Sequence, residues 1–382
     1  MSSKKKEFQR VLYVSEKAGF FGGVERYIYD SAKALKNGGW LVSMMYVEES
    51  RDLDDFLGIF YKTFKMDEID KIIAEEDFDL VVIFKVNDAG LVSKLRLAFN
   101  TSVCVSDHDY YCMRHHKYFP VGRMNCLLPA NFFYCSVCTL CKKNFFKFSA
   151  LLIEIRKCRS FMVLSEYMRS NLLMNGFPEK NIYKIYPVCE IPAAQDRKKA
   201  FANPPVIMFA GQLIRGKGVD LMLRALALLN KDYHALIVGD GKDMDFLKQL
   251  ASKLGIADKV EFAGWQNDIS KFWNKADIAV FPSRWQEPFG LTGIEAFAHK
   301  VPVVGFDVGG VTEWLYHGKN GLVVPSKDVV TLCAELEFLL GSHEIAEGMG
   351  IVAYKFVAKN FKAKSFVNAM DALLKETRSE NA

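Results

Sequence analysis

Two glutamates at a fixed spacing are the residues best suited to chemistry in this chain. Glu287 and Glu295 end the stretch Glu287-Pro288-Phe289-Gly290-Leu291-Thr292-Gly293-Ile294-Glu295, which follows the apolar strand-like run 278–281. Gly290 begins an apolar stretch that reads as a helix. The first N–H groups of a helix lack internal partners and, with the helix dipole, attract anions such as a diphosphate. We therefore expect Glu287 in a phosphate-holding loop and Glu295 on the helix. The alternative is two ordinary solvated residues.

Two cations occupy a second glycine-rich loop. Arg215 and Lys217 follow the strand-like run 206–210, in a segment that contains Gly211, Gly216 and Gly218. At the carboxyl end of a strand they could neutralise the charge that develops on a departing diphosphate. The simpler interpretation is a turn with two solvated charges.

Together these motifs resemble those of the family-4 glycosyltransferases, with their E-x7-E signature. The resemblance runs from Gly22-Gly23 through 211–218 to Asn320-Gly321-Leu322-Val323. It implies an α/β protein of the GT-B fold, with two doubly wound, Rossmann-like domains facing a central cleft. It also implies a retaining enzyme that transfers a hexosyl group from a nucleotide-sugar donor, without a catalytic metal. The expected acceptor is a lipid-linked glycan or a growing surface polysaccharide, including lipopolysaccharide.

The resemblance assigns roles to individual residues. Arg215 and Lys217 would bind the phosphates, Glu295 the ribose hydroxyls and Glu287 the hydroxyls of the transferred sugar. Backbone N–H groups would face the sugar and phosphate from four consecutive residues: Phe289, Gly290, Leu291 and Thr292.

Three further positions depend more on this resemblance. Trp265 follows the run 260–262 where the family contacts the nucleobase, although an aromatic residue there is often core. Gly22 and Gly23 follow the first strand and could approach the diphosphate or acceptor, or only form a turn. His108 follows the run 101–105 and resembles the histidine that contacts the sugar near the reacting centre, against the alternative of a structural role.

A cysteine cluster departs from the plain family pattern. Five of the nine cysteines lie in one loop-like insertion at about 110–150: Cys112, Cys126, Cys135, Cys138 and Cys141. The spacing C-x2-C-x2-C suits ligands that converge on one ion, so four of them could form a structural zinc site. The cluster resembles that of a subset of the family, which carries cysteines after the His-Asp step. An iron–sulfur cluster and free thiols are the alternatives. An odd number of cysteines in a chain without a signal peptide argues against a disulfide framework.

The insertion continues into a stretch, 142–153, that interleaves lysines with aromatic residues. Such a mixture suits a membrane interface, and a helix buried in its own domain is the alternative. No window approaches the ~18 consecutive apolar residues of a membrane span. We therefore expect a cytoplasmic protein that contacts the inner membrane face peripherally.

The elements that must position these residues alternate between short β-branched runs and helical stretches, which is typical of βαβ units. With 382 residues, two domains are expected. We place an acceptor-side domain at 1–200 and a nucleotide-sugar-binding domain at 201–382, joined through the polar stretch 196–205. A terminal helical region from about His343 would cross back to the first domain. Ligand sites would lie at the carboxyl ends of the strands.

Composition excludes several other classes. Half the residues are apolar and the net charge of +5 is modest, so nucleic acid is not an expected partner. Metal-dependent GT-A enzymes carry D-x-D, but this triplet recurs too often here to be informative, and Gly239-Asp240-Gly241 lacks the third glycine of a dinucleotide fingerprint. A non-catalytic binding protein and a nucleotide-sugar epimerase are the alternative functions. Neither the donor, the acceptor, the linkage nor the oligomeric state can be inferred from the sequence.

Overall fold

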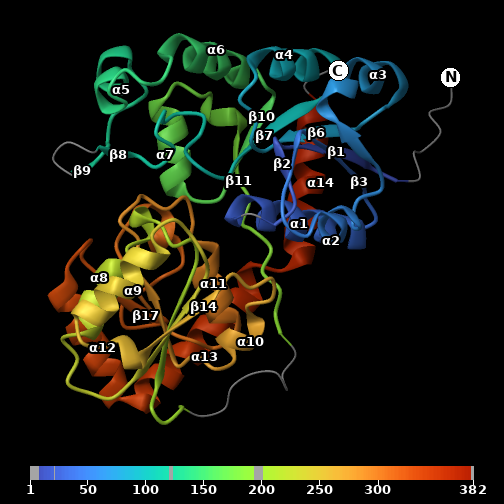
Figure 1. Ribbon diagram of the computed structural model, residues 1–382. Helices are drawn as coiled ribbons and strands as arrows, with labels where there is room; N and C mark the ends of the chain where they lie inside the picture. Colours follow the sequence, from blue (N-terminus) through green and yellow to red (C-terminus); the bar gives the residue numbers. More distant parts are fainter. Residues whose placement is uncertain (1–7, 21, 120–123, 193–200, 380–382) are drawn as a thin grey trace. The chain divides into compact units, whose positions relative to one another are not determined.

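The computed structural model describes residues 8–20, 22–119, 124–192 and 201–379 (Figure 1). The chain forms two compact units. Unit 1 contains the residues up to Val188 together with those from Ala363 onward, and unit 2 contains Cys189–Lys362. Each unit is built on a parallel β-sheet, which confirms the predicted α/β class.

Unit 2 has a six-stranded sheet in the order β14-β13-β12-β15-β16-β17. The strand order therefore reverses between β12 and β15, as in a doubly wound fold. The strands are β12 (Val206–Ala210), β13 (His234–Val238), β14 (Val260–Gly264), β15 (Ile278–Phe281), β16 (Val303–Phe306) and β17 (Gly321–Val324).

The helices of unit 2 follow these strands in alternation. They are α8 (Val219–Leu226), α9 (Met244–Lys253), α10 (Ser270–Trp273), α11 (Leu291–Ala298), α12 (Val329–Gly341) and α13 (His343–Asn360). Short 3-10 turns cover Arg215–Lys217, Ala257–Lys259 and Gly309–Glu313.

Unit 1 has a seven-stranded sheet in the order β11-β10-β7-β6-β1-β3-β5, so its strand order reverses between β1 and β6. Its strands are β1 (Arg10–Val14), β3 (Leu41–Tyr46), β5 (Thr63–Lys65), β6 (Leu80–Ile83), β7 (Thr101–Val105), β10 (Ser160–Val163) and β11 (Ile182–Lys184). Two small pairs join β2 (Lys17–Ala18) to β4 (Glu48–Glu49) and β8 (Tyr118–Phe119) to β9 (Met124–Asn125).

The helices of unit 1 vary from one turn to four. They are α1 (Gly23–Asn37), α2 (Leu53–Leu57), α3 (Ile69–Glu75), α4 (Ala89–Ala98), α5 (Phe132–Cys138), α6 (Phe145–Arg156), α7 (Glu166–Met174) and α14 (Ala363–Ser379). Short 3-10 turns cover Met66–Glu68 and Glu179–Asn181.

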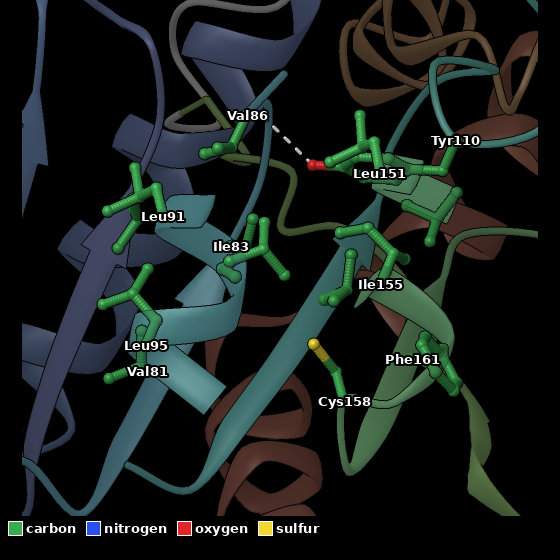
Figure 2. Packing of buried hydrophobic residues seen from close by; sticks show 14 of the residues in the cluster. Val81, Ile83, Val86, Leu91, Leu95, Tyr110, Leu151, Ile155, Cys158 and Phe161 are labelled. Carbon is green, nitrogen blue, oxygen red and sulfur yellow. Dashed lines mark hydrogen bonds between the residues drawn. The ribbon is translucent and has the colours of Figure 1, made fainter. Parts of the chain in front are cut away.

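One face of the unit 1 sheet carries a hydrophobic core under α4 and α6 (Figure 2). Leu95 of α4 and Ile155 of α6 are fully buried against Val81 and Ile83 of β6. A polar group enters this core with its hydrogen bonds satisfied, as burial requires. The Tyr110 hydroxyl donates to the Phe84 carbonyl at 2.8 Å and accepts from the Val86 N–H at 3.2 Å. This core thus holds in place the strand ends that carry the candidate residues.

The last helix belongs to unit 1. In α14, Phe366 is buried beside Tyr27 of α1, and the Arg159 guanidinium donates to the Thr377 carbonyl at 3.2 Å. Unit 2 begins earlier than the expected boundary near residue 200, because the Cys189 N–H donates to the Phe361 carbonyl at 3.0 Å. Residues 196–200 of the expected linker lie outside the described residues.

A buried tryptophan fixes the start of α11. Trp314 is fully buried, and its indole N–H donates to the Phe289 carbonyl at 2.6 Å. A Cβ atom at Gly293 would come within 2.1 Å of its ring. The absence of a side chain at Gly293 therefore lets the helix approach the indole.

Replacing Gly293 with alanine should lower the free energy of unfolding by about 1–2 kcal/mol, because the methyl group overpacks a rigid site. Gly348→Ala is the matched control. It lies within α13, where a Cβ would meet no atom within 4 Å, so alanine should stabilise the protein by about 0.5–1 kcal/mol. Urea denaturation followed by tryptophan fluorescence measures both. Equal effects of the two substitutions would contradict the packing argument.

Candidate functional site

The candidate site in unit 2 lies at the carboxyl ends of β12 and β15. The loop after β12 carries Arg215 and Lys217, and the loop after β15 carries Glu287. Open α/β sheets bind ligands where the strand order reverses, which in this unit is between these two strands.

An ion pair joins the two loops. The Lys217 ammonium lies 2.8 Å and 3.0 Å from the two carboxylate oxygens of Glu287. Glu287 is 6% exposed, and the Ser283 hydroxyl also donates to its carboxylate. Burial of a carboxylate is costly unless it is paired and hydrogen-bonded, and these contacts provide both and hold the Glu287 side chain in one place. A lysine ammonium has three N–H donors, and one remains for a further acceptor.

A second group of charges flanks this pair. Asp220, in the first turn of α8, accepts two hydrogen bonds from Arg284 at 2.5 Å and 2.6 Å, and the Arg215 guanidinium lies 3.0 Å from the same carboxylate. Arg215 is more than half exposed, whereas Arg284 is nearly buried. The three cations and two carboxylates leave one net positive charge at this sheet edge, which favours an anion.

Glycines make this close approach possible. Gly216 lies against the indole of Trp285, where a Cβ would come within 1.9 Å of the ring. Its carbonyl accepts the Arg284 N–H at 2.7 Å, so the β12 and β15 loops are bonded through their backbones as well.

Another glycine pair holds the Glu287 peptide. The Gly310 N–H donates to the Glu287 carbonyl at 2.7 Å, and the Gly309 N–H donates to the Gln286 side chain at 2.9 Å. Gly309 has φ +57°, and a Cβ there would meet the Glu287 carbonyl oxygen at 2.2 Å. Glu287 is therefore positioned from the β16 side too.

The structure places Glu287 in the loop and Glu295 on α11, as expected from the sequence. Gly290 caps α11 in the left-handed conformation, with φ 98°. Leu291 and Thr292 in its first turn are half-buried, while the Phe289 side chain is buried beside Phe361. Glu295 is half-buried in the second turn.

Trp265 lies farther along the edge of the sheet. It follows β14, which β13 separates from β12. Its indole is half-buried, and the N–H donates to the Asn267 side chain at 2.7 Å.

The candidates in unit 1 also lie at strand ends. Gly22 caps α1 and Gly23 is its first residue. His108 follows β7 and is 1% exposed; its Nδ1 atom lies 2.7 Å from the Tyr111 hydroxyl. Burial holds the pKa of Tyr111 well above its usual value, so its hydroxyl keeps its proton, and it donates to the Met168 sulfur at 2.9 Å.

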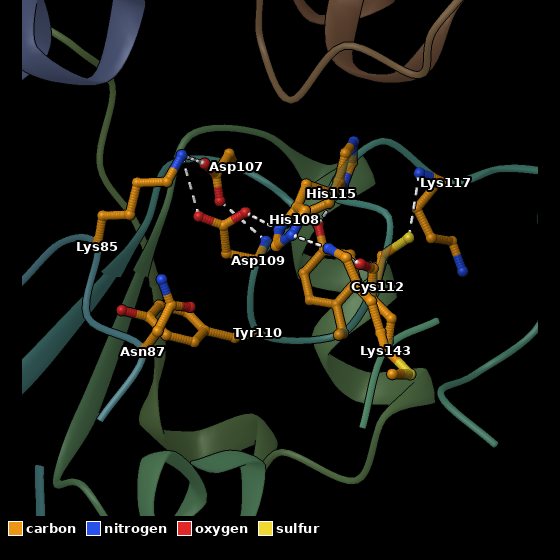
Figure 3. A network of polar contacts seen from close by, with 12 residues as sticks. Lys85, Asn87, Asp107, His108, Asp109, Tyr110, Cys112, His115, Lys117 and Lys143 are labelled. Carbon is orange, nitrogen blue, oxygen red and sulfur yellow. Dashed lines mark hydrogen bonds and ion pairs between the residues drawn. The ribbon is translucent and has the colours of Figure 1, made fainter. Parts of the chain in front are cut away.

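A charged network surrounds His108 (Figure 3). The Lys85 ammonium, just past β6, lies 2.9 Å from Asp107 and 3.1 Å from Asp109. Asp109 is buried and also pairs with Nδ1 of His115, whose Nε2 lies 2.7 Å from Lys143. The network connects the ends of β6 and β7 with the cysteine-rich insertion.

The two aspartates titrate differently. Burial and the neighbouring Asp109 charge raise the pKa of Asp107. Burial would also raise the pKa of Asp109, but its hydrogen bond with His115 and the Lys85 charge hold that pKa below its usual value. Asp109 therefore stays ionised at neutral pH. Its contribution to stability is present above the ordinary aspartate pKa and is lost as the pH falls below it.

The five clustered cysteines are partly or fully exposed free thiols. Burial raises the pKa of Cys138 to about 11; nearby Arg114 lowers it, and the neighbouring Cys112, Cys126 and Cys135 raise it. These four thiols thus lie within electrostatic range of one another. Within the described residues, no three histidine, cysteine or acidic side chains are arranged to hold a metal ion. The remaining cysteines, Cys104, Cys158, Cys189 and Cys333, are buried.

Sequence reasoning missed several residues of these sites. Arg284, Asp220 and Ser283 in unit 2, and Lys85 in unit 1, received no role. Arg284, Ser283 and Lys85 lie two or three residues past a strand end, which was the available signal, whereas Asp220 lies in the first turn of α8. Gly309-Gly310 after β16 is a glycine pair like Gly22-Gly23, and it could have been identified from the sequence in the same way.

A family model covers most of unit 2. Residues 191–356 match the model described as Glycosyl transferases group 1. The matched segment is thus similar to a group 1 glycosyltransferase module. It contains both charge clusters of unit 2, with Arg215, Lys217, Asp220, Arg284 and Glu287.

Known proteins match about half of the chain. The chain is 32% identical over 184 residues to an exopolysaccharide phosphotransferase of Streptomyces coelicolor, a match that covers 47% of this chain and 19% of that protein. It is 30% identical over 173 residues to the lipopolysaccharide core biosynthesis glycosyltransferase LpsE of Rhizobium meliloti, covering 45% of this chain and 50% of LpsE. The chain thus spans half or less of the length of these relatives.

Solved structures show the same fold over both units. The crystal structure of Anabaena HepE in complex with UDP-glucose matches with a TM-score of 0.75 and 16% identity, covering 96% of this chain and 99% of HepE. The predicted GT-B fold is confirmed.

Replacing Lys85 with methionine should lower the free energy of unfolding by about 2 kcal/mol, because Asp107 and Asp109 would lose their shared cation. This expected loss is smaller than the loss for a fully buried ion pair, because the Lys85 side chain is 35% exposed. Lys94→Met, which removes an exposed pair with Asp70, should cost less than about 0.5 kcal/mol. Urea denaturation at neutral pH measures the loss of stability in both variants. Similar losses would contradict the argument, because the Lys85 network would then stabilise the protein no more than an exposed ion pair does.

Zinc binding stays a prediction, based on the cysteine spacing. We expect about one equivalent of zinc per chain, measured by elemental analysis of protein purified without chelator, and Cys135→Ser should lower that content. Cys333→Ser, which removes a buried cysteine of unit 2, is the control and should leave the metal content unchanged. Less than about a tenth of an equivalent of zinc or iron would reject metal ligation.

Proposed function

We propose that the protein is a retaining glycosyltransferase that transfers a hexosyl group from a nucleotide sugar to a lipid-linked glycan or a growing surface polysaccharide. The observation that carries the proposal is the net positive cluster of Arg215, Lys217 and Arg284 at the strand-order reversal of a group 1 module. The names of relatives in lipopolysaccharide and exopolysaccharide biosynthesis support this class of acceptor. A place of action at the inner membrane face is part of the proposal.

The donor diphosphate would lie between the β12 loop and the first turn of α11. Arg215 has guanidinium N–H groups beyond the one that faces Asp220, and Lys217 keeps one donor beyond its two contacts with Glu287. Both cations would stabilise the charge that grows on the leaving diphosphate as the bond to the sugar breaks. The N–H groups of the α11 first turn would add to this stabilisation.

The two glutamates would orient the rest of the donor. Glu287 is held in place by Lys217 and Ser283, so it can accept hydrogen bonds from sugar hydroxyls in a fixed geometry. Glu295, on the same helix that begins at Gly290, would accept those of the ribose. We assign no general base in unit 2; the leaving phosphate itself would assist deprotonation of the acceptor on the same face of the sugar.

His108 and the unit 1 strand ends would serve the sugar or the acceptor. The contact with Tyr111 would hold the imidazole of His108 in one orientation, so that it could form a hydrogen bond with the sugar or the acceptor. The Lys85–Asp107–Asp109 network would keep the peptide around His108 in place.

Donor binding tests the proposal. Titration calorimetry with UDP-, GDP- and ADP-sugars should reveal one that binds, and UDP-glucose is the first choice because HepE was crystallised with it. Arg215→Gln should weaken binding of that donor about tenfold or more through loss of a charge-assisted phosphate contact. Arg224→Gln, on the exposed side of α8, is the control and should bind like the wild type. No binding to any donor would refute the proposal.

Product analysis separates the alternatives. A transferase extends the acceptor or slowly hydrolyses the donor, whereas an epimerase converts the donor sugar without any acceptor. A non-catalytic binding protein would bind the donor and leave it intact.

A further inference from the structure

An exposed apolar surface lies on the cysteine-rich insertion of unit 1. Nine of the twenty-two exposed large hydrophobic side chains in the described residues fall within 127–153. Several are highly exposed, including Leu127 at 74%, Phe133 at 66% and Phe146 at 73%. We call this set the α5–α6 surface; its members are Leu127, Leu128, Phe132, Phe133, Tyr134, Val137, Leu140, Phe146 and Ile153.

The surface is anchored to the core of unit 1. Phe132 of α5 lies 5.5 Å from Phe145 and 5.7 Å from Phe146 of α6, measured between ring centroids, so the two helices share an aromatic cluster. The other side of α6 is buried, with Leu151 and Ile155 in the hydrophobic core. In α5, by contrast, none of the seven residues is buried. Figure 1 shows α5 at the margin of unit 1, beside α6. Packing within the chain therefore does not account for the apolar residues of α5.

The charges around this surface have one sign. No acidic residue occurs between Asp109 and Glu154, whereas six basic residues do: Arg114, Lys117, Arg123, Lys142, Lys143 and Lys147. Lys142 and Lys147 are exposed at the end of the α5–α6 loop and in the first turn of α6. Arg123 lies outside the described residues.

We propose that the α5–α6 surface docks the protein on an anionic lipid bilayer. Phenylalanine and leucine side chains would enter the boundary between headgroups and acyl chains, and the lysines would face the lipid phosphates. The chemistry selects this occupant over a second copy of the chain, because two copies would bring basic surfaces together. By contrast, an apolar surface with lysines at its margin complements a bilayer, whose apolar acyl chains lie beneath negatively charged headgroups.

Docking would explain how the insertion serves the proposed function. The insertion starts directly after His108 and is joined to its neighbours through Asp109, His115 and Lys143. A protein held at the bilayer through α5 and α6 would keep this strand end near a lipid-linked acceptor. This step depends on the proposed function, whereas the docking itself does not.

Vesicle co-sedimentation without donor tests the docking directly. The full-length protein should bind vesicles of phosphatidylcholine and phosphatidylglycerol in equal parts much more strongly than pure phosphatidylcholine, and added salt should weaken that binding. The double variant Phe133→Ser/Phe146→Ser should lower the partition coefficient about tenfold or more. Lys142→Gln/Lys147→Gln should lower it similarly on anionic vesicles only, since each lysine contributes about fivefold. Lys143 is left intact because its ammonium donates to the Met113 carbonyl.

Leu228→Ser/Val330→Ser is the matched control, because both side chains are exposed but belong to unit 2. It should bind like the wild type. Phe146→Trp supplies a second measurement, which reports on insertion directly and does not depend on a loss of binding. The fluorescence of this tryptophan should shift to the blue on vesicles and be quenched by brominated lipid. The fluorescence of Val330→Trp, the control, should do neither. Donor binding by the same samples is measured separately, so either proposal can fail alone.

Three outcomes would overturn the docking proposal. They are equal or absent binding to the two kinds of vesicle, unchanged binding of the phenylalanine double variant, and a wild-type dimer that this variant converts to a monomer. The last result would assign the surface to a second copy of the chain.

Discussion

A buried carboxylate is the constraint on which the unit 2 site depends. Glu287 is almost fully removed from water, and a charge in that position is tolerated only with a fixed counter-ion and hydrogen bonds. Its counter-ion, Lys217, comes from the loop after a different strand, so both loops must be ordered together. Gly216 and Gly309 allow the backbone to come close enough for this. The pairing of Glu287 with Lys217, and of Asp220 with Arg215 and Arg284, brings three cations and two carboxylates together at this sheet edge, with one net positive charge.

The two units repeat one topology with different charge arrangements at their strand ends. Both sheets reverse their strand order beside the first strand of the unit. In unit 2 the excess charge near the reversal is positive and partly exposed at Arg215. In unit 1 the carboxylates of Asp107 and Asp109 share the ammonium of Lys85, and His115 connects Asp109 with Lys143. The same topology therefore carries an exposed cation in one unit and a buried network of both signs in the other.

The sequence predicted the buried central strands well, because β-branched runs such as 101–105, 206–210 and 278–281 have one stable arrangement in a parallel sheet. It missed β3, whose Met44 and Met45 weaken the strand pattern, and the short strands β5 and β11 at the edges. The loop position of Glu287 and the helical position of Glu295 were predicted from glycine and hydrophobic pattern. The ion pairs Lys217–Glu287 and Lys85–Asp109 could not be predicted, because each contact joins segments that only the folded sheet brings together.

The return of α14 to unit 1 has a consequence for how the protein is made. All of unit 2 lies in sequence between the two parts of unit 1. While the chain emerges from the ribosome, α1 therefore exposes the apolar side that Phe366 later covers, and Asp79 lacks its partner Arg378. Unit 2 has all of its residues once Lys362 has emerged, whereas unit 1 also needs α14. Until α14 has emerged, the nascent first unit exposes apolar surface of the kind that promotes aggregation and chaperone binding.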